Sequence, residues 1–275
     1  MINLLKTDLK RIIKDKLFLI VCIIGAAFAI ITPLLYFLIF KVAGDLSDIE
    51  MMGLNFSGKS VFFSSFSPAS DFGIILPIFI SIIIFKDFSY GTIRNKIISG
   101  HSRVSIFVSM FISSFITLFS IIILYAFLSL GVTLLFVNYQ AEPFGIKDLG
   151  YFLASLGFVL LGYLFIAALI SFLSVSMKNV GLTIVSYAAI SMVFTIVSSL
   201  LQIGILILES NGNSTVLPIL EFFQNINLFN SLGTVIGQGH TYTLENILYL
   251  VLSSVIGIVF YGGFGLLIIN KKEIK

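Results

Sequence analysis

The chain has 275 residues, of which 58% are hydrophobic and only 11% are charged, and its mean hydropathy is +1.12. An average soluble domain is about 25% charged. This composition therefore excludes a single water-soluble core and indicates an all-α integral membrane protein that crosses the bilayer several times. One cysteine, Cys22, excludes an intrachain disulfide framework, and with only two histidines it leaves little for a transition-metal site.

Residues 1–16 are predicted to form an amphipathic helix that lies on the membrane interface. Apolar side chains recur at helical spacing, and basic side chains are expected on the opposite face. The alternative is that this segment is only the positive flank of the first membrane span. The apolar set is Ile2, Leu5, Leu9, Ile12 and Ile13, and the basic set is Lys6, Lys10, Arg11 and Lys14.

Six apolar runs are predicted to be transmembrane helices, because a hydrocarbon core of about 30 Å needs about 20 apolar residues at 1.5 Å per residue. The second run is uninterrupted only from Phe72 to Phe85, so its helix is expected to begin near Pro68 or Ser70, with a kink at Pro77. The predicted spans are residues 17–40, 70–85, 104–137, 151–177, 181–208 and 247–269.

The basic residues favour one orientation of these six spans. Placing both chain ends, the 86–103 segment and the turn at Lys178 in the cytoplasm puts 13 of the 16 Lys and Arg residues on that side. Only Lys41, Lys59 and Lys147 then lie on the outer side. The sequence therefore predicts a multi-pass protein of the cell membrane with both termini cytoplasmic, including a short tail over residues 270–275.

The apolar cores of the six runs contain no Asp, Glu, Lys, Arg or His. A proton- or sodium-coupled carrier keeps such a group near the middle of the membrane, and an intramembrane enzyme needs an acid/base pair or metal ligands there. This pattern disfavours a secondary carrier, a proton pump or an enzyme. We expect no cofactor on this chain and a source of free energy outside it.

The fifth span carries a stripe of neutral polar residues. Steps of three or four residues place them on one helix face, which fits either the wall of a transport path or a dimer seam. The alternative is hydrogen bonding between packed helices. The stripe is Thr183, Tyr187, Ser191, Thr195, Ser198 and Gln202, and the third span has a shorter row of Ser109, Ser113, Thr117 and Ser120.

Two stretches are predicted to form the principal outer segments. Residues 41–71 are a polar loop whose Val61–Phe66 patch is expected to enter the membrane interface. In this loop, Gly53–Ser60 satisfies the pattern of a phosphate-binding loop, which requires a strand before it and a helix from the lysine. The preceding residues, Asp45–Met52, contain three acids and no strand-like run, so we interpret the match as chance. Residues 209–246 form the second, longer segment.

The one large polar insertion between cytoplasmic span ends is Lys86 to Arg103, KDFSYGTIRNKIISGHSR. It is long enough for a helix of two or three turns, with apolar side chains available for a protein surface and basic ones for phosphate or carboxylate groups. The alternative is an ordinary positive-inside loop. The apolar set is Tyr90, Ile93, Ile97 and Ile98, and the basic set is Arg94, Lys96 and Arg103.

The run Asp87–Arg94, DFSYGTIR, followed by Gly100–Arg103, GHSR, resembles the cytosolic loop of ABC-2-type permeases, the membrane subunits of ABC exporters. The order of elements along nearly the whole chain is similar too. Two departures are Asp87, where the family usually has Glu, and Met110, where it often has Lys.

This resemblance implies a cytosolic coupling helix that docks on a separate ABC ATPase subunit carrying ATP and Mg²⁺. It also implies a second permease chain, identical or related, and a re-entrant hairpin within 209–246, over Val216–Ile236. The cargo would be amphiphilic or hydrophobic: an antimicrobial peptide, a drug or a lipid-like molecule, and no nucleic acid. The alternatives are a membrane scaffold or sensor without transport activity and a secondary carrier. The coupling residues would be Asp87, Tyr90, Gly91, Thr92, Ile93, Arg94, Lys96 and Arg103.

Overall fold

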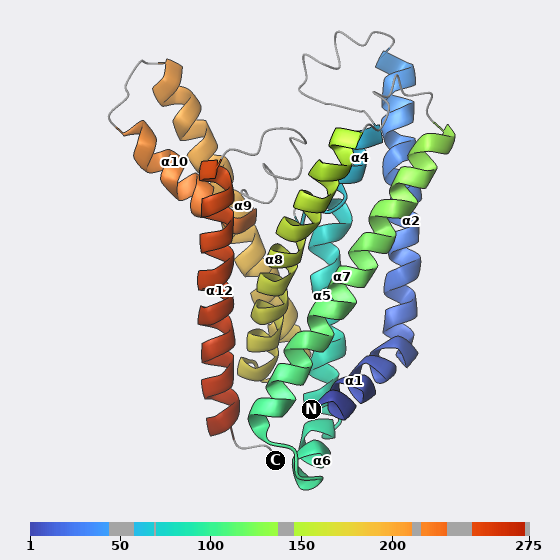
Figure 1. Ribbon diagram of the computed structural model, residues 1–275, viewed down its shortest axis with the longest axis vertical. Helices are drawn as coiled ribbons and strands as arrows, with labels where there is room; N and C mark the ends of the chain where they lie inside the picture. Colours follow the sequence, from blue (N-terminus) through green and yellow to red (C-terminus); the bar gives the residue numbers. More distant parts are fainter. Residues whose placement is uncertain (44–57, 69, 137–145, 211–215, 230–243, 273–275) are drawn as a thin grey trace.

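The computed structural model describes residues 1–43, 58–68, 70–136, 146–210, 216–229 and 244–272. All regular secondary structure in these residues is helical, and no strand occurs among them. Six helices are long and apolar enough to cross a membrane, which confirms the predicted all-α class and the number of spans in this part of the chain (Figure 1).

The helix bounds follow the apolar runs, but α8 begins at Ile146 instead of residue 151, and α5 ends later than predicted. The second span was expected to end at Phe85, but its helix continues to Ser89 and so carries Lys86 and Asp87 in its last turns. The helices are α1 (Ile2–Lys14), α2 (Lys16–Ala43), α4 (Gly58–Ser64), α5 (Asp71–Ser89), α6 (Thr92–Ile98), α7 (Arg103–Phe136), α8 (Ile146–Ser176), α9 (Val180–Ser210), α10 (Leu217–Ile226) and α12 (Leu244–Lys271).

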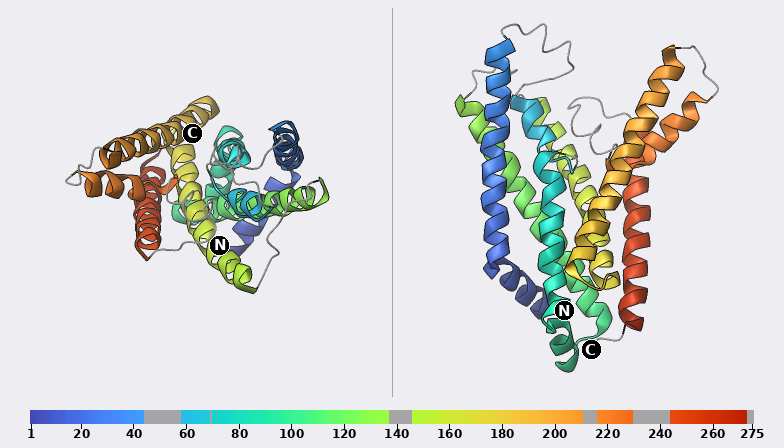
Figure 2. Two further views of the ribbon diagram at one scale, coloured as in Figure 1. Left: turned by 90° about the horizontal axis from the view of Figure 1, so that it is seen from above. Right: turned by 180° about the vertical axis from the view of Figure 1, so that it is seen from behind.

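The long helices form one elongated bundle. The start of α1, the short helix α6 and the end of α12 lie at one end, and α4 and α10 lie toward the other (Figure 1). Seen from behind, α9, α10 and α12 make one side of the bundle and α1 and α2 make the other. Between them stand α5 and α8, while α7 runs obliquely across the bundle to the upper end of α2 (Figure 2). The contacts of α12 with α8, of α2 with α7 and of α9 with α5 hold these groups together.

Glycines allow α12 to approach its neighbours closely. A Cβ atom at Gly257 would lie 2.2 Å from the ring of Phe165 in α8, and one at Gly265 would lie 2.4 Å from the ring of Phe107 in α7. Each ring therefore occupies the space that a side chain on α12 would need. Two aromatic residues from different helices are seated on α12 in this way.

The Val61–Phe66 patch packs against other helices, with all of its residues except Ser64 buried, and its predicted place at the membrane interface stays a prediction. Phe62 is 3% exposed, and its ring centroid lies 5.5 Å from that of Phe127 in α7 and 5.6 Å from that of Phe152 in α8. Aromatic contacts of this kind add stabilisation beyond the area they bury. The helix α4 begins at Gly58, inside the match to the phosphate-binding loop, whereas residues 44–57 lie outside the described residues.

Candidate functional site

The connection between α5 and α7 contains the helix α6, which lies at the end of the bundle where both termini are found (Figure 1). A glycine with positive φ lies on each side of it: Gly91 at +67° directly before the helix and Gly100 at +89° just after it. Residues with a Cβ atom rarely adopt this left-handed conformation. The two glycines therefore allow the chain to turn sharply into and out of α6.

A buried network of ion pairs connects α6 to three other helices. The Lys96 ammonium in α6 lies 2.7 Å from Asp8 Oδ1 of α1 and 3.3 Å from Asp87 Oδ2 of α5. Ser109 of α7 donates a hydrogen bond to Asp8 Oδ2 at 2.7 Å. Arg11 of α1 forms an ion pair with Asp87. We call Asp8, Arg11, Asp87 and Lys96 the ion quartet.

The quartet contains two acids and two bases, so its formal charges cancel. Asp8 and Asp87 are each 2% exposed and Lys96 is 9% exposed. Burial lowers the pKa of the Lys96 ammonium, and the hydrogen bond from Lys96 to Asp8 opposes this effect. Because ions buried in this way depend on their partners, removing one member of such a pair costs about 3–5 kcal/mol.

A second ion pair fixes the junction between α1 and α2. The Lys86 ammonium of α5 contacts both carboxylate oxygens of Asp15, at 2.8 and 2.7 Å, and the backbone N–H of Leu17 donates to Asp15 Oδ1 at 2.9 Å. Burial would raise the pKa of Asp15, but the hydrogen bonds and the positive charge of Lys86 outweigh it, so the pKa is lowered. The helix α1 is thus held to the α5–α6 corner along its length.

The predicted coupling residues separate into two groups. Asp87, Ile93 and Lys96 are internal: Ile93 is 1% exposed and packs with Leu4 of α1 and Ile106 of α7. The expectation that Lys96 and Ile93 reach a partner is therefore wrong. Gly91 and Thr92 are half-buried, whereas Tyr90, at 75% exposed, and Arg94 lie on the surface together with Ile98.

Arg103 has a structural partner that the sequence did not indicate. Its guanidinium donates to the carbonyls of Ile269, Asn270 and Lys272, at 3.1, 2.8 and 2.9 Å. The first residue of α7 therefore caps the end of α12, where free carbonyls carry partial negative charge. The sequence predicted that Arg103 contacts a phosphate or a partner carboxylate. In the structure, part of its guanidinium is instead engaged by carbonyls of its own chain.

The face that α1 presents to the protein also differs from the prediction. Leu4, Asp8 and Ile12 are buried, whereas Ile2 and Ile13, at 80% and 62% exposed, lie on the surface. Arg11 was expected to point away but reaches Asp87. Asp8 and Arg11 are thus the members of the site that sequence reasoning missed. The available signal is the four-residue spacing that places Asp8 between Leu4 and Ile12 on one face.

The polar stripe of α9 has some buried and some exposed side chains. Thr183, Tyr187 and Ser191 are buried, Ser198 is half-buried, and Thr195 and Gln202 are exposed. Several of its hydroxyls donate within α9, as from Ser191 to the Ala188 carbonyl at 3.0 Å and from Thr195 to the Ser191 carbonyl at 2.9 Å. Only the exposed members of the stripe, Thr195 and Gln202, are accessible to cargo, lipid or another chain.

The segment after α9 returns along that helix. Asn227, just after α10, donates through Nδ2 to the carbonyl of Phe194 at 2.7 Å. Phe194 lies 16 residues before the end of α9 at Ser210, which is about 24 Å along the helix axis. The α10 arm therefore reaches deep along α9. The rest of the predicted hairpin, residues 230–236, lies outside the described residues, so the hairpin as a whole stays a prediction.

Comparison of the chain with protein-family models, with curated proteins and with solved structures gave no match. Within the described residues, no group of three or more His, Cys, Asp or Glu side chains is arranged to hold a metal ion. The site is therefore characterised by its own geometry: a short helix fixed from behind by buried charges, with its other face exposed.

Proposed function

We propose that this chain is the permease subunit of an ATP-driven ABC exporter of the ABC-2 type. The observation that carries the proposal is the double character of α6. Its inner side is held by the ion quartet, and its outer side presents Arg94 and Ile98 to solvent, close in the chain to the exposed Tyr90 that ends α5. A helix that only closed a loop would need no such buried anchoring.

The ion quartet supplies a route for force from α6 into the membrane. A push on α6 acts on α1, α5 and α7 together, because the quartet and Ser109 connect all four helices. Reversing a two-state equilibrium from 1:99 to 99:1 takes about 5.5 kcal/mol. Removing one partner of a buried ion pair costs about 3–5 kcal/mol, so α6 should stay attached to the other three helices when it is displaced.

In this proposal the end of the bundle with α6 and both termini faces the cytoplasm of the cell, as the basic residues favour. A separate ABC ATPase subunit binds ATP and Mg²⁺ and docks on Tyr90 and Arg94. Two permease chains, identical or related, form the path. The cargo is an amphiphilic or hydrophobic molecule, because the stripe of α9 is neutral and weakly polar.

The first test is to isolate the tagged chain from its native membrane in mild detergent and to identify its partners by mass spectrometry. We expect a soluble ATPase with its own phosphate-binding loop, at about one copy per permease. Absence of an ATPase under conditions that preserve the other partners of the chain would refute the proposal.

The second test changes exposed side chains on α6 and at the end of α5. Replacing Tyr90 and Arg94 together by alanine should weaken ATPase binding by roughly 30-fold or more, because buried Tyr and Arg anchors contribute about 2 kcal/mol or more at interfaces. Both side chains are exposed, so folding should not change. The matched control replaces the exposed Lys10 and Lys14 of α1, and it should retain the ATPase. Equal loss in both double variants would show that α6 is not the docking surface.

A further inference from the structure

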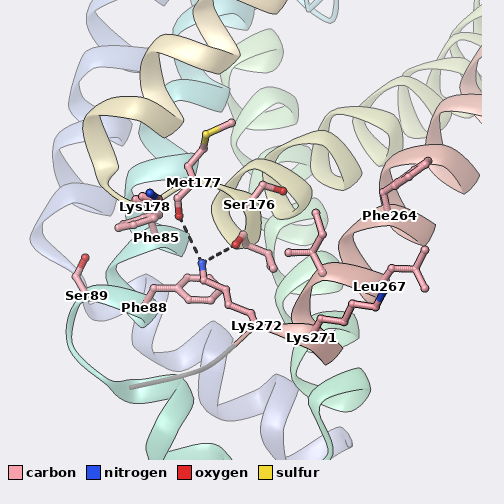
Figure 3. Close-up of a pocket in the computed structure, with 12 residues that line it drawn as sticks. Phe85, Phe88, Ser89, Ser176, Met177, Lys178, Phe264, Leu267, Lys271 and Lys272 are labelled. Carbon is pink, nitrogen blue, oxygen red and sulfur yellow. Dashed lines mark hydrogen bonds between the residues drawn. The ribbon is translucent and has the colours of Figure 1, made fainter.

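A cavity of about 780 Å³ lies at the same end of the bundle as α6, between the end of α5, the α8–α9 turn and the end of α12 (Figure 3). Its apolar walls come from Phe85 and Phe88 of α5 and from Phe264, Leu267 and Ile268 of α12. It is separate from the exposed side of α6 and from the polar stripe of α9. Neither the ion quartet nor the docking surface proposed above uses it.

Three lysines line the polar part of this cavity, Lys178, Lys271 and Lys272, and no acidic residue is among the described residues that line it. Lys178 and Lys271 are exposed, and no ion pair joins either one to another described residue. The cavity therefore concentrates positive charge.

Lys272 is held in place by the end of α8 and by Phe88 of α5. Its ammonium donates to the carbonyls of Val175 at 2.6 Å and Met177 at 3.4 Å, and lies 4.9 Å from the centroid of the Phe88 ring (Figure 3). The carbonyls at the end of α8 would otherwise repel an anion, and Lys272 covers them. An ammonium has three donors, so one stays available after these two hydrogen bonds.

The cavity is polar at the end of the bundle and apolar toward its middle. On α12, Phe264, Leu267 and Lys271 follow at steps of three and four residues and share one face. Phe264 and Lys271 are separated by about 10 Å along the helix axis. Phe264 and Leu267 are 47% and 58% exposed, so this wall opens toward the surroundings of the bundle, where lipid tails lie.

We propose that this cavity binds an anionic glycerophospholipid. Its phosphate lies among Lys178, Lys271 and Lys272, and one acyl chain runs along Phe264 and Leu267. Basic pockets between transmembrane helices on the cytoplasmic side are suited to anionic headgroups, and the apolar wall supplies the site for a tail that a free anion does not have. The proposal does not depend on an ATPase partner.

The test uses the full chain purified in neutral detergent, with any partners that accompany it. Phosphatidylglycerol and phosphatidylcholine with identical acyl chains are titrated, and binding is followed by native mass spectrometry and by the melting temperature. We expect phosphatidylglycerol to bind and to raise the melting temperature, and phosphatidylcholine to do neither. Replacing Lys178 and Lys271 together by glutamine should weaken phosphatidylglycerol binding about 30-fold, at about fivefold per lysine.

Two matched variants complete the experiment. Replacing the exposed Lys6 and Lys10 of α1 by glutamine removes the same charge from the same end of the protein and should leave binding unchanged. Replacing Lys178 and Lys271 by arginine keeps the charge and should preserve binding. Equal binding of both lipids, equal weakening by the α1 variant, or equal stabilisation by inorganic phosphate alone would overturn the proposal.

Discussion

Replacing Lys96 by methionine would remove the central cation of the ion quartet while keeping a side chain of similar length. Asp8 and Asp87, each 2% exposed, would then share Arg11 as their remaining cation in the quartet. Loss of one partner from a buried ion pair costs about 3–5 kcal/mol. If this cost falls on the docking of α1, the undocked population should rise by roughly 150- to 4,000-fold.

The undocked population can be measured by thiol labelling. Leu4 is 5% exposed in the docked helix, so Leu4→Cys in a Cys22→Ser background should react slowly with a maleimide. Adding Lys96→Met should accelerate labelling by the factor above. The exposed Lys10→Met serves as the control and should not change the rate.

A double variant separates the loss of charge balance from the loss of packing. Adding Asp8→Asn to Lys96→Met removes one unpaired acid and leaves Arg11 and Asp87 as a pair, so labelling should slow again. Coupling of this kind is what a double-mutant cycle isolates. The reasoning is refuted if Lys96→Met labels at the parental rate, or if Asp8→Asn only adds to its effect.

Three further predictions address the same end of the bundle. Gly91→Ala should destabilise the chain by about 1–2 kcal/mol, because φ is +67° at this position, although a Cβ atom would meet no neighbour there. Gly131→Ala on α7, where a Cβ atom also meets no neighbour, should not destabilise it. Equal melting temperatures of the two variants would contradict this. Asp15→Asn should destabilise the protein above the ordinary pKa of 3.8, and the difference should vanish as the pH falls through the lower native pKa, because only the ionised carboxylate gains from Lys86; a difference that persists in acid, measured by chemical denaturation, would exclude that ion pair as the cause. Arg103→Gln should cost about 1–2 kcal/mol and make the end of α12 more sensitive to protease, with Arg103→Lys intermediate. Unchanged protease sensitivity would show that the capping contacts do not hold the end of α12.

The spanning helices were predictable because an apolar run of about 20 residues or more is long enough to cross the hydrocarbon core and is too apolar for a water-exposed segment. For example, the run beginning at Val104 gave a helix from Arg103 to Phe136. The end of α5 was missed because Lys86 and Asp87 look like the start of a loop, although both are satisfied by α1. Polar residues mark the end of a membrane run but not the end of a helix, and only the fold shows which partners let the helix continue.

The ion quartet could not be read from the sequence, because its members are far apart in the chain and each has an ordinary surface explanation. Asp8 lies among lysines on an amphipathic helix, where an exposed acid is common. The periodicity of α1 was visible, but a hydrophobic face indicates only burial and not whether lipid or protein covers it. The spacing of Leu4, Asp8 and Ile12 was the one indication that protein covers part of it.

The sequence separation inside the quartet sets an order on the synthesis of this protein. Asp8 meets Lys96, 88 residues later, and Ser109, 101 residues later. At about 5–20 residues per second, these partners leave the ribosome roughly 5–20 s after α1. During that interval the exposed lysines of α1 can hold it at the headgroups, and the helix docks only when the third span arrives. The first helix made can therefore take its place only after two spans and the start of a third have been synthesised.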